Sequence, residues 1–406
     1  MACRRFLNFQ PIDEPSWRKR DRKYERVPPV KQMITDIGNY HTIWSKKLRN
    51  SEKNSFVEAK REIVKEFLFQ VQQGEDIGLN DQGTFEKVFN DETKYFEKRG
   101  RKRECSPSAD YSPRKKICNE SQSIAERSDQ DSLPNTLDIE DYIFENSTEE
   151  GNDEDNKITE TKNLLRGYWH LKSELKKLSD EEQKNYIGEI DVETCIQECH
   201  EVLMRDLLIE TKTQPGKFSV LPRSASFDGE DFFYPSYETE EIAFQAVDTV
   251  VLEYNKMVRE ISKIENKHQK LELSLKCATV LLFGFLTLHP FSDGNGRLAR
   301  LLCSHCLKVF CPFPTSIYNV FSHSTRDDYL RALVTARRHL KIDPDQLKHA
   351  EDATNEAELI LEQKPNELCS LVIESNWFTW RQFLHKIGED IQLFNFEKKT
   401  KEIKET

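Results

Sequence analysis

The stretch His289-Pro-Phe-Ser-Asp-Gly-Asn-Gly-Arg-Leu-Ala-Arg300 decides how this chain is interpreted, because it joins two predicted helices through a short polar loop. An apolar helix is predicted to end at Leu288, and a second helix begins near Arg297, where the apolar positions resume. Gly294 and Gly296 leave the backbone bare between them. The N–H groups of that backbone can therefore converge on an anion at the N-terminus of the second helix.

Four side chains of this stretch add chemistry to the anion site. Arg297 and Arg300, three positions apart on a helix, can both reach an extended phosphate chain. Asp293 offers a hard carboxylate oxygen, which suits Mg²⁺ bound jointly with phosphate oxygens. His289 lies at the loop entrance, and an ordinary imidazole pKa of about 6.5 suits proton abstraction at neutral pH. The stretch predicts a site for a polyphosphate, a metal ion and a nucleophile that must lose a proton.

The same residues match the motif His-x-Phe-x-Asp/Glu-Gly-Asn-Gly-Arg-x-x-Arg at every defined position, so the chain resembles the Fic (Fido) family. The resemblance extends over roughly residues 145–340. Residues 275–288 look like the central helix that leads into the motif. Pro215-Gly216-Lys217-Phe218 and the hairpin after it look like the family's flap, and residues 326–333 look like the helix that closes the nucleotide pocket.

This resemblance implies a protein adenylyltransferase that moves AMP from ATP, with Mg²⁺, onto a Ser, Thr or Tyr hydroxyl of a target protein. His289 would take the proton of that hydroxyl, and Asp293 would hold the metal ion. Arg297 would pair with the β-phosphate and Arg300 with the γ-phosphate. The implied nucleotide-binding residues are Gly294, Asn295, Gly296, Arg297, Arg300 and Tyr329. Gly296 stands where Doc-type kinases have a bulkier basic residue, which implies the AMP-transfer orientation of ATP.

A hairpin is predicted between Gly216 and Pro235, because the short runs 223–227 and 231–234 bracket Asp228-Gly229. The resemblance implies that this hairpin receives the target segment by strand addition. The implied docking residues are Arg223, Ser224, Ala225, Ser226 and Phe227. Ser219 departs from the family, whose members often have Arg there. A plain structural turn is the alternative.

An inhibitory segment is predicted at residues 145–152, where Ser147-Thr-Glu-Glu150-Gly151-Asn152 is similar to the family's inhibitory helix. Glu150 would pair with Arg300 and so deny that guanidinium to the γ-phosphate. The same glutamate could instead position a water that removes AMP from modified targets. The residue before it is usually apolar but is Glu149 here, so a solvated acidic run is the alternative.

The predicted fold class is mainly α: a Fic-fold helical bundle with a short β-hairpin flap, a small N-terminal helical domain and a disordered charged linker. The predicted regions are a disordered basic N-terminus (1–28), a small helical domain (29–99), the linker (100–144), the Fic domain (145–340) and a C-terminal helical region (341–406). The helices expected in the Fic domain are 158–177, 191–209, 239–263, 268–287 and 297–310. A further helix is expected with Ser324 as its N-cap and Asp327 three residues on.

Composition limits the classes of partner. The chain has 406 residues and a net charge of -11, so a nucleic-acid role has no global electrostatic support. The longest apolar stretch, Ala278–Leu288, is too short to cross a bilayer and predicts a buried helix. The start of the chain has no apolar run typical of a secretory signal. Basic clusters at 98–103 and 114–116 resemble a bipartite nuclear import signal, with a solvated linker as the alternative, so a cytoplasmic or nuclear location is expected.

Ten cysteines in a chain of this length favour a reducing compartment over a disulfide framework. Cys303, Cys306 and Cys311, with His305 and His323, allow a zinc site, but their helical spacing favours packed core thiols. Two other functions stay open: the same scaffold acting as a de-AMPylase or transferring another phosphate-containing group, or a nuclear adaptor that only binds ATP. The oligomeric state is also open, with a homodimer among the alternatives.

Overall fold

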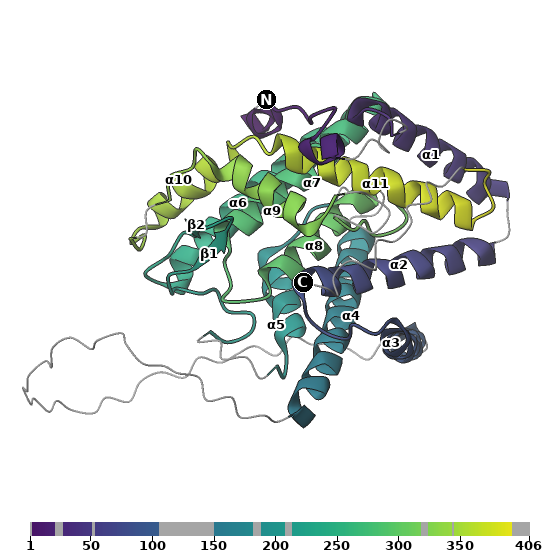
Figure 1. Ribbon diagram of the computed structural model, residues 1–406, viewed down its shortest axis with the longest axis horizontal. Coiled ribbons are helices and arrows are strands. Elements are labelled where there is room, and N and C mark those ends of the chain that lie inside the picture. Colours follow the sequence, from purple (N-terminus) through teal and green to yellow (C-terminus); the bar gives the residue numbers. More distant parts are fainter. Residues whose placement is uncertain are drawn as a thin grey trace, which may run out of the picture.

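The computed structural model is helical almost throughout its described part, with a single two-stranded sheet there (Figure 1). The described residues are 2–20, 27–50, 53–104, 150–181, 188–207, 213–317, 324–342 and 345–391. The N-terminal elements are the 3₁₀ helices η1 (Ala2–Leu7) and η2 (Ser16–Arg20), then α1 (Val30–Asn50), α2 (Lys53–Glu75), α3 (Gln82–Glu104) and α4 (Glu150–Glu181). The middle of the chain forms the π-helix η4 (Val192–Gln197), α5 (Glu198–Met204), β1 (Ser224–Phe227), β2 (Glu230–Phe233), α6 (Glu240–Ser262) and α7 (Lys267–Leu288). The remaining elements are α8 (Asn295–Cys306), the 3₁₀ helix η5 (Leu307–Val309), α9 (Arg326–Arg337), α10 (Ala350–Leu361) and α11 (Asn366–Lys386).

Helix α7 is the centre of the core. Every residue from Leu275 to Leu288 is buried, and α1, α6, α8, α10 and α11 pack around the helix. A helix that is apolar on all sides must be enclosed on all sides. This helix is also long and apolar enough to cross a membrane, but 89% of its most apolar window is buried inside the protein. The enclosure by other helices accounts for its composition, as the predicted buried helix requires.

The N-terminal helices share this core with the rest of the chain. Helix α1 packs on α7 and α11, and α2 packs on α8 and α11. One cluster of buried apolar side chains runs from Phe6 to Ile387. The guanidinium of Arg18 pairs with Glu374 of α11 at 2.9 Å, and both side chains are buried. Residues 29–99, predicted as a small helical domain of unknown function, contribute helices to this common core.

Capping residues set several helix starts. Thr239 caps α6 and Asn266 caps α7, each through its side chain. Thr325, not the predicted Ser324, caps α9, with Asp328 completing a capping box. Both registers place an Asp three residues after a hydroxyl residue. The observed register, which begins at Thr325, buries Tyr329 and Ala332 against the core. The capping residues alone could not decide between the two registers.

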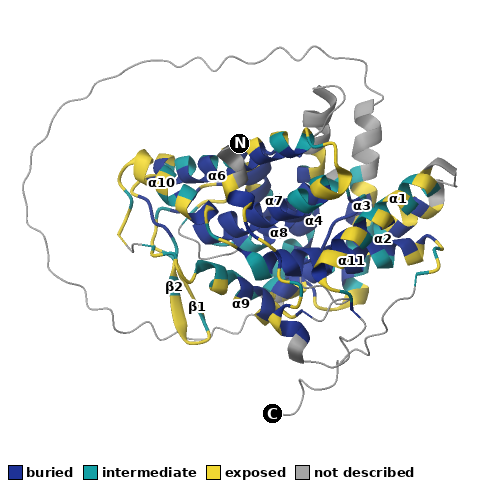
Figure 2. Cartoon of the chain, turned by 90° about the horizontal axis from the view of Figure 1, so that it is seen from above, coloured by how far each residue is buried: buried dark blue, intermediate teal, exposed yellow. Residues whose placement is uncertain are grey.

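The predicted hairpin is confirmed. Strands β1 and β2 pair antiparallel, with Ala225 opposite Phe232. Asp228 and Gly229 form the turn with φ values of 53° and 79°, the left-handed conformation that a two-residue hairpin turn needs. Most of the hairpin is exposed and stands clear of the buried helices (Figure 2).

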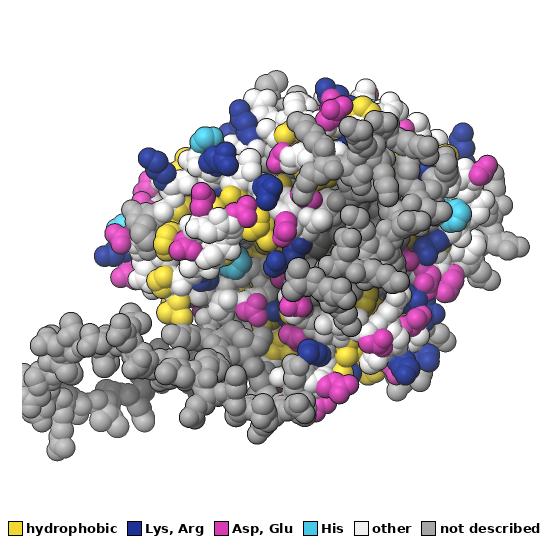
Figure 3. Space-filling model, viewed as in Figure 1, with side chains coloured by type: hydrophobic (Ala, Val, Ile, Leu, Met, Phe, Trp, Pro, Cys, Tyr) yellow, Lys and Arg dark blue, Asp and Glu magenta, His cyan; other side chains and the backbone are white. Residues whose placement is uncertain are grey.

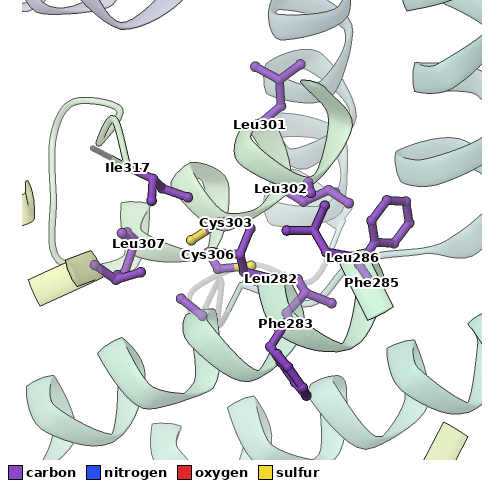
Figure 4. Close-up of a cluster of buried hydrophobic side chains, with 14 of the residues drawn as sticks. Leu282, Phe283, Phe285, Leu286, Leu301, Leu302, Cys303, Cys306, Leu307 and Ile317 are labelled. Atoms are coloured by element: carbon purple, nitrogen blue, oxygen red, sulfur yellow. The ribbon is translucent and has the colours of Figure 1, made fainter. Parts of the chain in front are cut away.

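The cysteines of α8 belong to the core. Cys303 and Cys306 lie among apolar side chains of α7 and α8, including Leu282 and Leu286 (Figure 4). Burial raises the pKa of the Cys306 thiol to about 12, so the group behaves as a packed, protonated thiol. Of the predicted zinc candidates, Cys311 is buried as well, and His323 lies outside the described residues.

Two predictions concern the segment between α3 and α4. Helix α3 continues to Glu104, so the first basic cluster (98–103) is the end of a helix rather than part of the predicted linker. The second cluster (114–116) lies outside the described residues. The nuclear import signal and the linker therefore stay predictions. On the face drawn in Figure 3, acidic and basic side chains are interspersed among the described residues.

Candidate active site

The loop between α7 and α8 is shaped by two backbone positions in the left-handed region. His289 ends α7 with φ 48° and ψ 57°, and its N–H donates to the carbonyl of Phe285 at 2.9 Å. Gly294 caps α8 with φ 75°, and a β-carbon there would lie 2.8 Å from the sulfur of Met204. A glycine is thus required at that position. The predicted base therefore lies at one end of the loop and the predicted anion site at the other.

Asn295 holds the loop closed. Its side-chain amide donates to the carbonyl of Phe291 at 2.7 Å, and its carbonyl oxygen accepts from the N–H of Phe291 at 3.0 Å. The side chain is 1% exposed. Asn295 was predicted as a phosphate-binding residue through its backbone; its side chain has this second, structural task.

His200 of α5 bonds the loop between α7 and α8 and connects this loop to the flap. Its Nδ1 accepts from the N–H of Gly216 at 2.9 Å, so the proton is on Nε2, which donates to the carbonyl of Asp293 at 2.9 Å. The ring stacks on Phe291 with centroids 3.6 Å apart. Burial lowers the pKa of His200 to about 4, which keeps the ring neutral. The sequence indicated a histidine on a buried helix face but not these two bonds.

Asp293 and Arg297 meet in the structure. The Asp293 carboxylate accepts from Arg297 at 2.9 Å and from the N–H of Gly294 at 2.6 Å. Among the described residues, no three His, Cys, Asp or Glu side chains gather as a metal site. The Asp293 side chain is 46% exposed. A single accessible carboxylate fits a Mg²⁺ ion that takes its other oxygens from phosphate and water.

The guanidinium of Arg300 already has partners within the chain. Its guanidinium pairs with Glu75, the last residue of α2, and also donates to the carbonyl of Val71 at 3.1 Å. Arg300 is 3% exposed, with its guanidinium carbon 5.7 Å from the ring centre of Tyr329. Arg326 of α9 adds a bond to the carbonyl of Gly74 at 2.9 Å. Two arginines thus cap the C-terminal end of α2, where helix carbonyls attract cations.

The carboxylate of Glu75 lies against the anion site itself. A β-carbon added to Gly296 would collide with both oxygens of Glu75. Gly296 is in the first turn of α8, where backbone N–H groups favour a negative charge. A protein carboxylate therefore lies beside the loop predicted to bind phosphate.

Helix α4 holds the segment that carries Glu75. Glu160 accepts from the N–H of Gly78 at 2.7 Å, and the Thr161 hydroxyl accepts from the N–H of Leu79 at 3.1 Å. That hydroxyl also bonds the buried Gln72 at 3.0 Å. The turn after α2 is therefore held by α4, and the C-terminal end of α2 is held by α8 and α9.

Glu150, the predicted inhibitory glutamate, is the first residue of α4, and its side chain lies outside the described residues. Its role stays a prediction. Glu150 was predicted to pair with Arg300. In the structure Glu75 pairs with Arg300 instead. Glu75 has neither a Ser or Thr three to four residues before it nor a Gly or Asn directly after it, so it does not match the family's inhibitory pattern.

His289 is half-buried next to the end of the hairpin. Its ring stacks on Tyr234, with centroids 4.0 Å apart and planes 16° from parallel. Burial lowers the pKa of His289 to about 3, and the guanidinium of Arg223 adds to the effect. The imidazole is therefore neutral, the form that can accept a proton.

Arg223 fastens the base of the flap. Its guanidinium donates to the carbonyls of Ser219 at 2.8 Å, Leu221 at 2.9 Å and Pro235 at 2.6 Å. The N–H of Ser219 in turn donates to the carbonyl of Pro290 in the loop at 2.8 Å. Arg223 was predicted to dock a target; the structure gives it bonds within the chain. The other predicted docking residues form β1, and its residues 224–226 are exposed.

Tyr329, predicted beside the adenine, is 3% exposed on α9 next to Arg300. The structure therefore brings together the predicted base, metal ligand, both arginines and Tyr329. It leaves Glu150 untested, and it adds His200, Glu75 and Tyr234.

Comparison with known proteins identifies a family and several relatives that the chain is similar to. The Fic/DOC family matches the sequence over residues 191–307. A ribonucleoside-diphosphate reductase small chain from Ostreid herpesvirus 1 (isolate France) is 28% identical over 153 residues, which are 37% of this chain and 23% of that protein. A Fido domain-containing protein from Dictyostelium discoideum is 38% identical over 63 residues, 15% of this chain and 41% of that protein. The chain thus spans less than half the length of either curated relative.

Two solved structures are similar in fold. A Fic domain containing signaling protein from Bacteroides thetaiotaomicron superposes with a TM-score of 0.50 at 18% identity, over 89% of this chain and 98% of that chain. Fic-1 from C. elegans gives a TM-score of 0.49 at 13% identity, over 87% of this chain and 71% of that chain. The first likeness supports a shared fold that includes the N-terminal helices.

Proposed function

This chain belongs to the Fic/DOC family through residues 191–307, and we propose on that premise that it is a protein adenylyltransferase under autoinhibition. Members of the family generally transfer AMP or another phosphate-linked group to proteins. The proposed substrates are ATP and a protein segment with an accessible Ser, Thr or Tyr hydroxyl. The observation that carries the proposal is the neutral imidazole of His289 at the entrance of an anion-binding loop.

The proposed reaction is an in-line displacement at the α-phosphorus. His289 accepts the proton of the target hydroxyl, and the oxygen forms a bond to the α-phosphorus. The bond from that phosphorus to the β-bridging oxygen breaks, and pyrophosphate leaves. Arg297 and the backbone N–H groups at the start of α8 stabilise the negative charge of the departing group. A magnesium ion held by Asp293 would neutralise charge on the α- and β-phosphates.

Glu75 is the proposed brake. Its carboxylate pairs with Arg300 and lies at Gly296, so it withholds the guanidinium and occupies the space of an anion. ATP would have to displace it to reach the reactive orientation. A de-AMPylase remains a second candidate, because a carboxylate held in this place could also orient a water toward a modified hydroxyl.

The test uses ATP labelled at the α- or the γ-phosphate with the full-length chain and lysate proteins. We expect α-label on protein, lost in His289→Ala. Glu75→Gly should raise the initial rate roughly ten- to a hundredfold, since a charge-assisted hydrogen bond contributes about 1.5–3 kcal/mol. Glu150→Gly is the matched control, because the two variants together show which glutamate restrains the transfer.

Each outcome decides an alternative. Transfer of γ-label would indicate a kinase, and transfer of neither label would indicate an ATP-binding adaptor. A larger gain from Glu150→Gly than from Glu75→Gly would restore the sequence-based assignment. Faster release of AMP from pre-labelled protein by the wild type than by Glu75→Gly would favour the de-AMPylase.

A further inference from the structure

Three side chains from distant parts of the chain form a stack over the predicted base. The ring of Tyr234 lies 4.0 Å from that of His289, nearly parallel to it. The guanidinium carbon of Arg337 lies 4.8 Å from the ring centre of Tyr234. His289 follows α7, Tyr234 follows β2, and Arg337 ends α9. Three separate elements therefore contribute one side chain each to a stack that contains the imidazole.

Tyr234 is itself held by its neighbours. Its N–H donates to the carbonyl of Arg223 at 3.0 Å, which continues the hairpin ladder by one residue. Arg337 donates to the carbonyl of Phe233 at 2.6 Å, directly before Tyr234. The tyrosine thus has a fixed backbone, and its ring contacts both His289 and Arg337.

The imidazole needs such a support. His289 lies at a helix end with a left-handed backbone and is half-buried, so surrounding core atoms do not enclose its ring completely. Proton transfer depends on the ring plane, because one nitrogen must come within hydrogen-bond distance of the target hydroxyl. An aromatic face stacked on the ring restricts its rotation and leaves its edge accessible.

We propose that Tyr234 is a positioning residue for the transfer, which fixes the ring plane of His289 and is kept in place by Arg337. This inference rests on the proposed function. Because Tyr234 directly follows β2, the same contact aligns the base with the hairpin that is proposed to receive the target. The charged groups that face the ring are Arg223, Arg337 and Asp293.

The kinetic test compares Tyr234→Ala, Tyr234→Phe and Arg337→Gln in the full-length wild type and in Glu75→Gly. Tyr234→Ala should lower kcat on the order of ten- to a hundredfold with little change in KM for ATP, the cost of a misplaced catalytic group. Tyr234→Phe keeps the ring and should restore the rate. Tyr95→Ala on α3 is the matched control and should leave kcat unchanged.

A spectroscopic test does not depend on turnover. In protein with labelled histidine, the ring protons of His289, assigned by their loss in His289→Ala, should be shifted upfield by the stacked tyrosine. Tyr234→Ala should remove this shift, whereas Tyr234→Phe should keep it. The spectrum also shows whether each variant is folded.

The outcomes separate the inference from the proposed function. If no variant transfers α-label, the transfer itself is refuted. If the wild type transfers label and Tyr234→Ala keeps its kcat, only the positioning role is refuted. A faster Tyr234→Ala would also overturn the inference and show that the tyrosine covers the base. A slow Tyr234→Phe would assign the effect to the hydroxyl instead of the stacked ring.

Discussion

The loop at residues 289–300 and the hairpin at residues 224–233 are neighbours built in opposite ways. Buried side chains bond the loop's backbone, Asn295 from within the loop and His200 from α5. The hairpin has its own ladder, the fastening of Arg223 at its base, and one bond each from Arg331 and Arg337 of α9. The difference matches two kinds of ligand: a rigid loop suits a nucleotide that is always the same, and an exposed strand suits protein segments that differ.

The largest effect is expected from a variant that loosens the rigid loop. Asn295→Ala removes two hydrogen bonds and leaves the N–H and carbonyl of Phe291 unpaired in a buried place. The free energy of unfolding should fall by roughly 2–4 kcal/mol, and α-label transfer should be lost. Urea denaturation measures the first and the labelling assay the second.

The control for this variant lies in the hairpin. Ser226→Ala at an exposed position should change the free energy of unfolding by less than about 0.5 kcal/mol. An equal loss of unfolding free energy in both variants would mean that the hairpin is as firmly built as the loop.

A smaller effect is expected at the junction of the two regions. Arg223→Gln loses the bonds to three flap carbonyls, so the hairpin can move relative to His289. KM for a protein target should rise roughly tenfold, because binding must now order the flap. The free energy of unfolding should fall by only about 1–2 kcal/mol. A change confined to KM for ATP would contradict the fastening role.

The smallest expected effect is an absence of pH dependence. A base works in its neutral form, which predominates above its pKa, and burial lowers the pKa of His289 to about 3. The acid limb of transfer should therefore appear below about pH 4, with the rate nearly flat between about pH 5.5 and 7.5. An NMR titration of the His289 ring over the same range should show no protonation. A midpoint near the ordinary value would show that water reaches the ring.

The sequence predicted most of the local structure. The apolar run Ala278–Leu288, the turn at Asp228-Gly229 and the glycines of the loop are short-range patterns with direct backbone consequences. The pairing of Glu75 with Arg300 is different in kind. It depends on how the end of α2 packs against α8, and no local pattern around Glu75 encodes that packing.

The site shows the same limit. Residues His289, Asp293 and Arg297 could be assigned from one continuous motif. Their supports His200 and Tyr234 could not, because each lies on another element and has no local signal beyond a buried or aromatic residue. Sequence patterns thus found the groups proposed to react, and the structure was needed for the groups proposed to orient them.

Helix α11 carries a consequence for how the chain is made. It is buried along most of its length, and Glu374 in its middle receives Trp17 and Arg18 from the first residues. A ribosome makes those partners at widely separated times, because Arg18 and Glu374 are 356 residues apart. The segment that carries Trp17 and Arg18 must therefore wait for α11, so we expect the native core to close only after translation has passed residue 386. A chain cut at 340 would leave that segment without Glu374 and would leave α7 without α10 and α11.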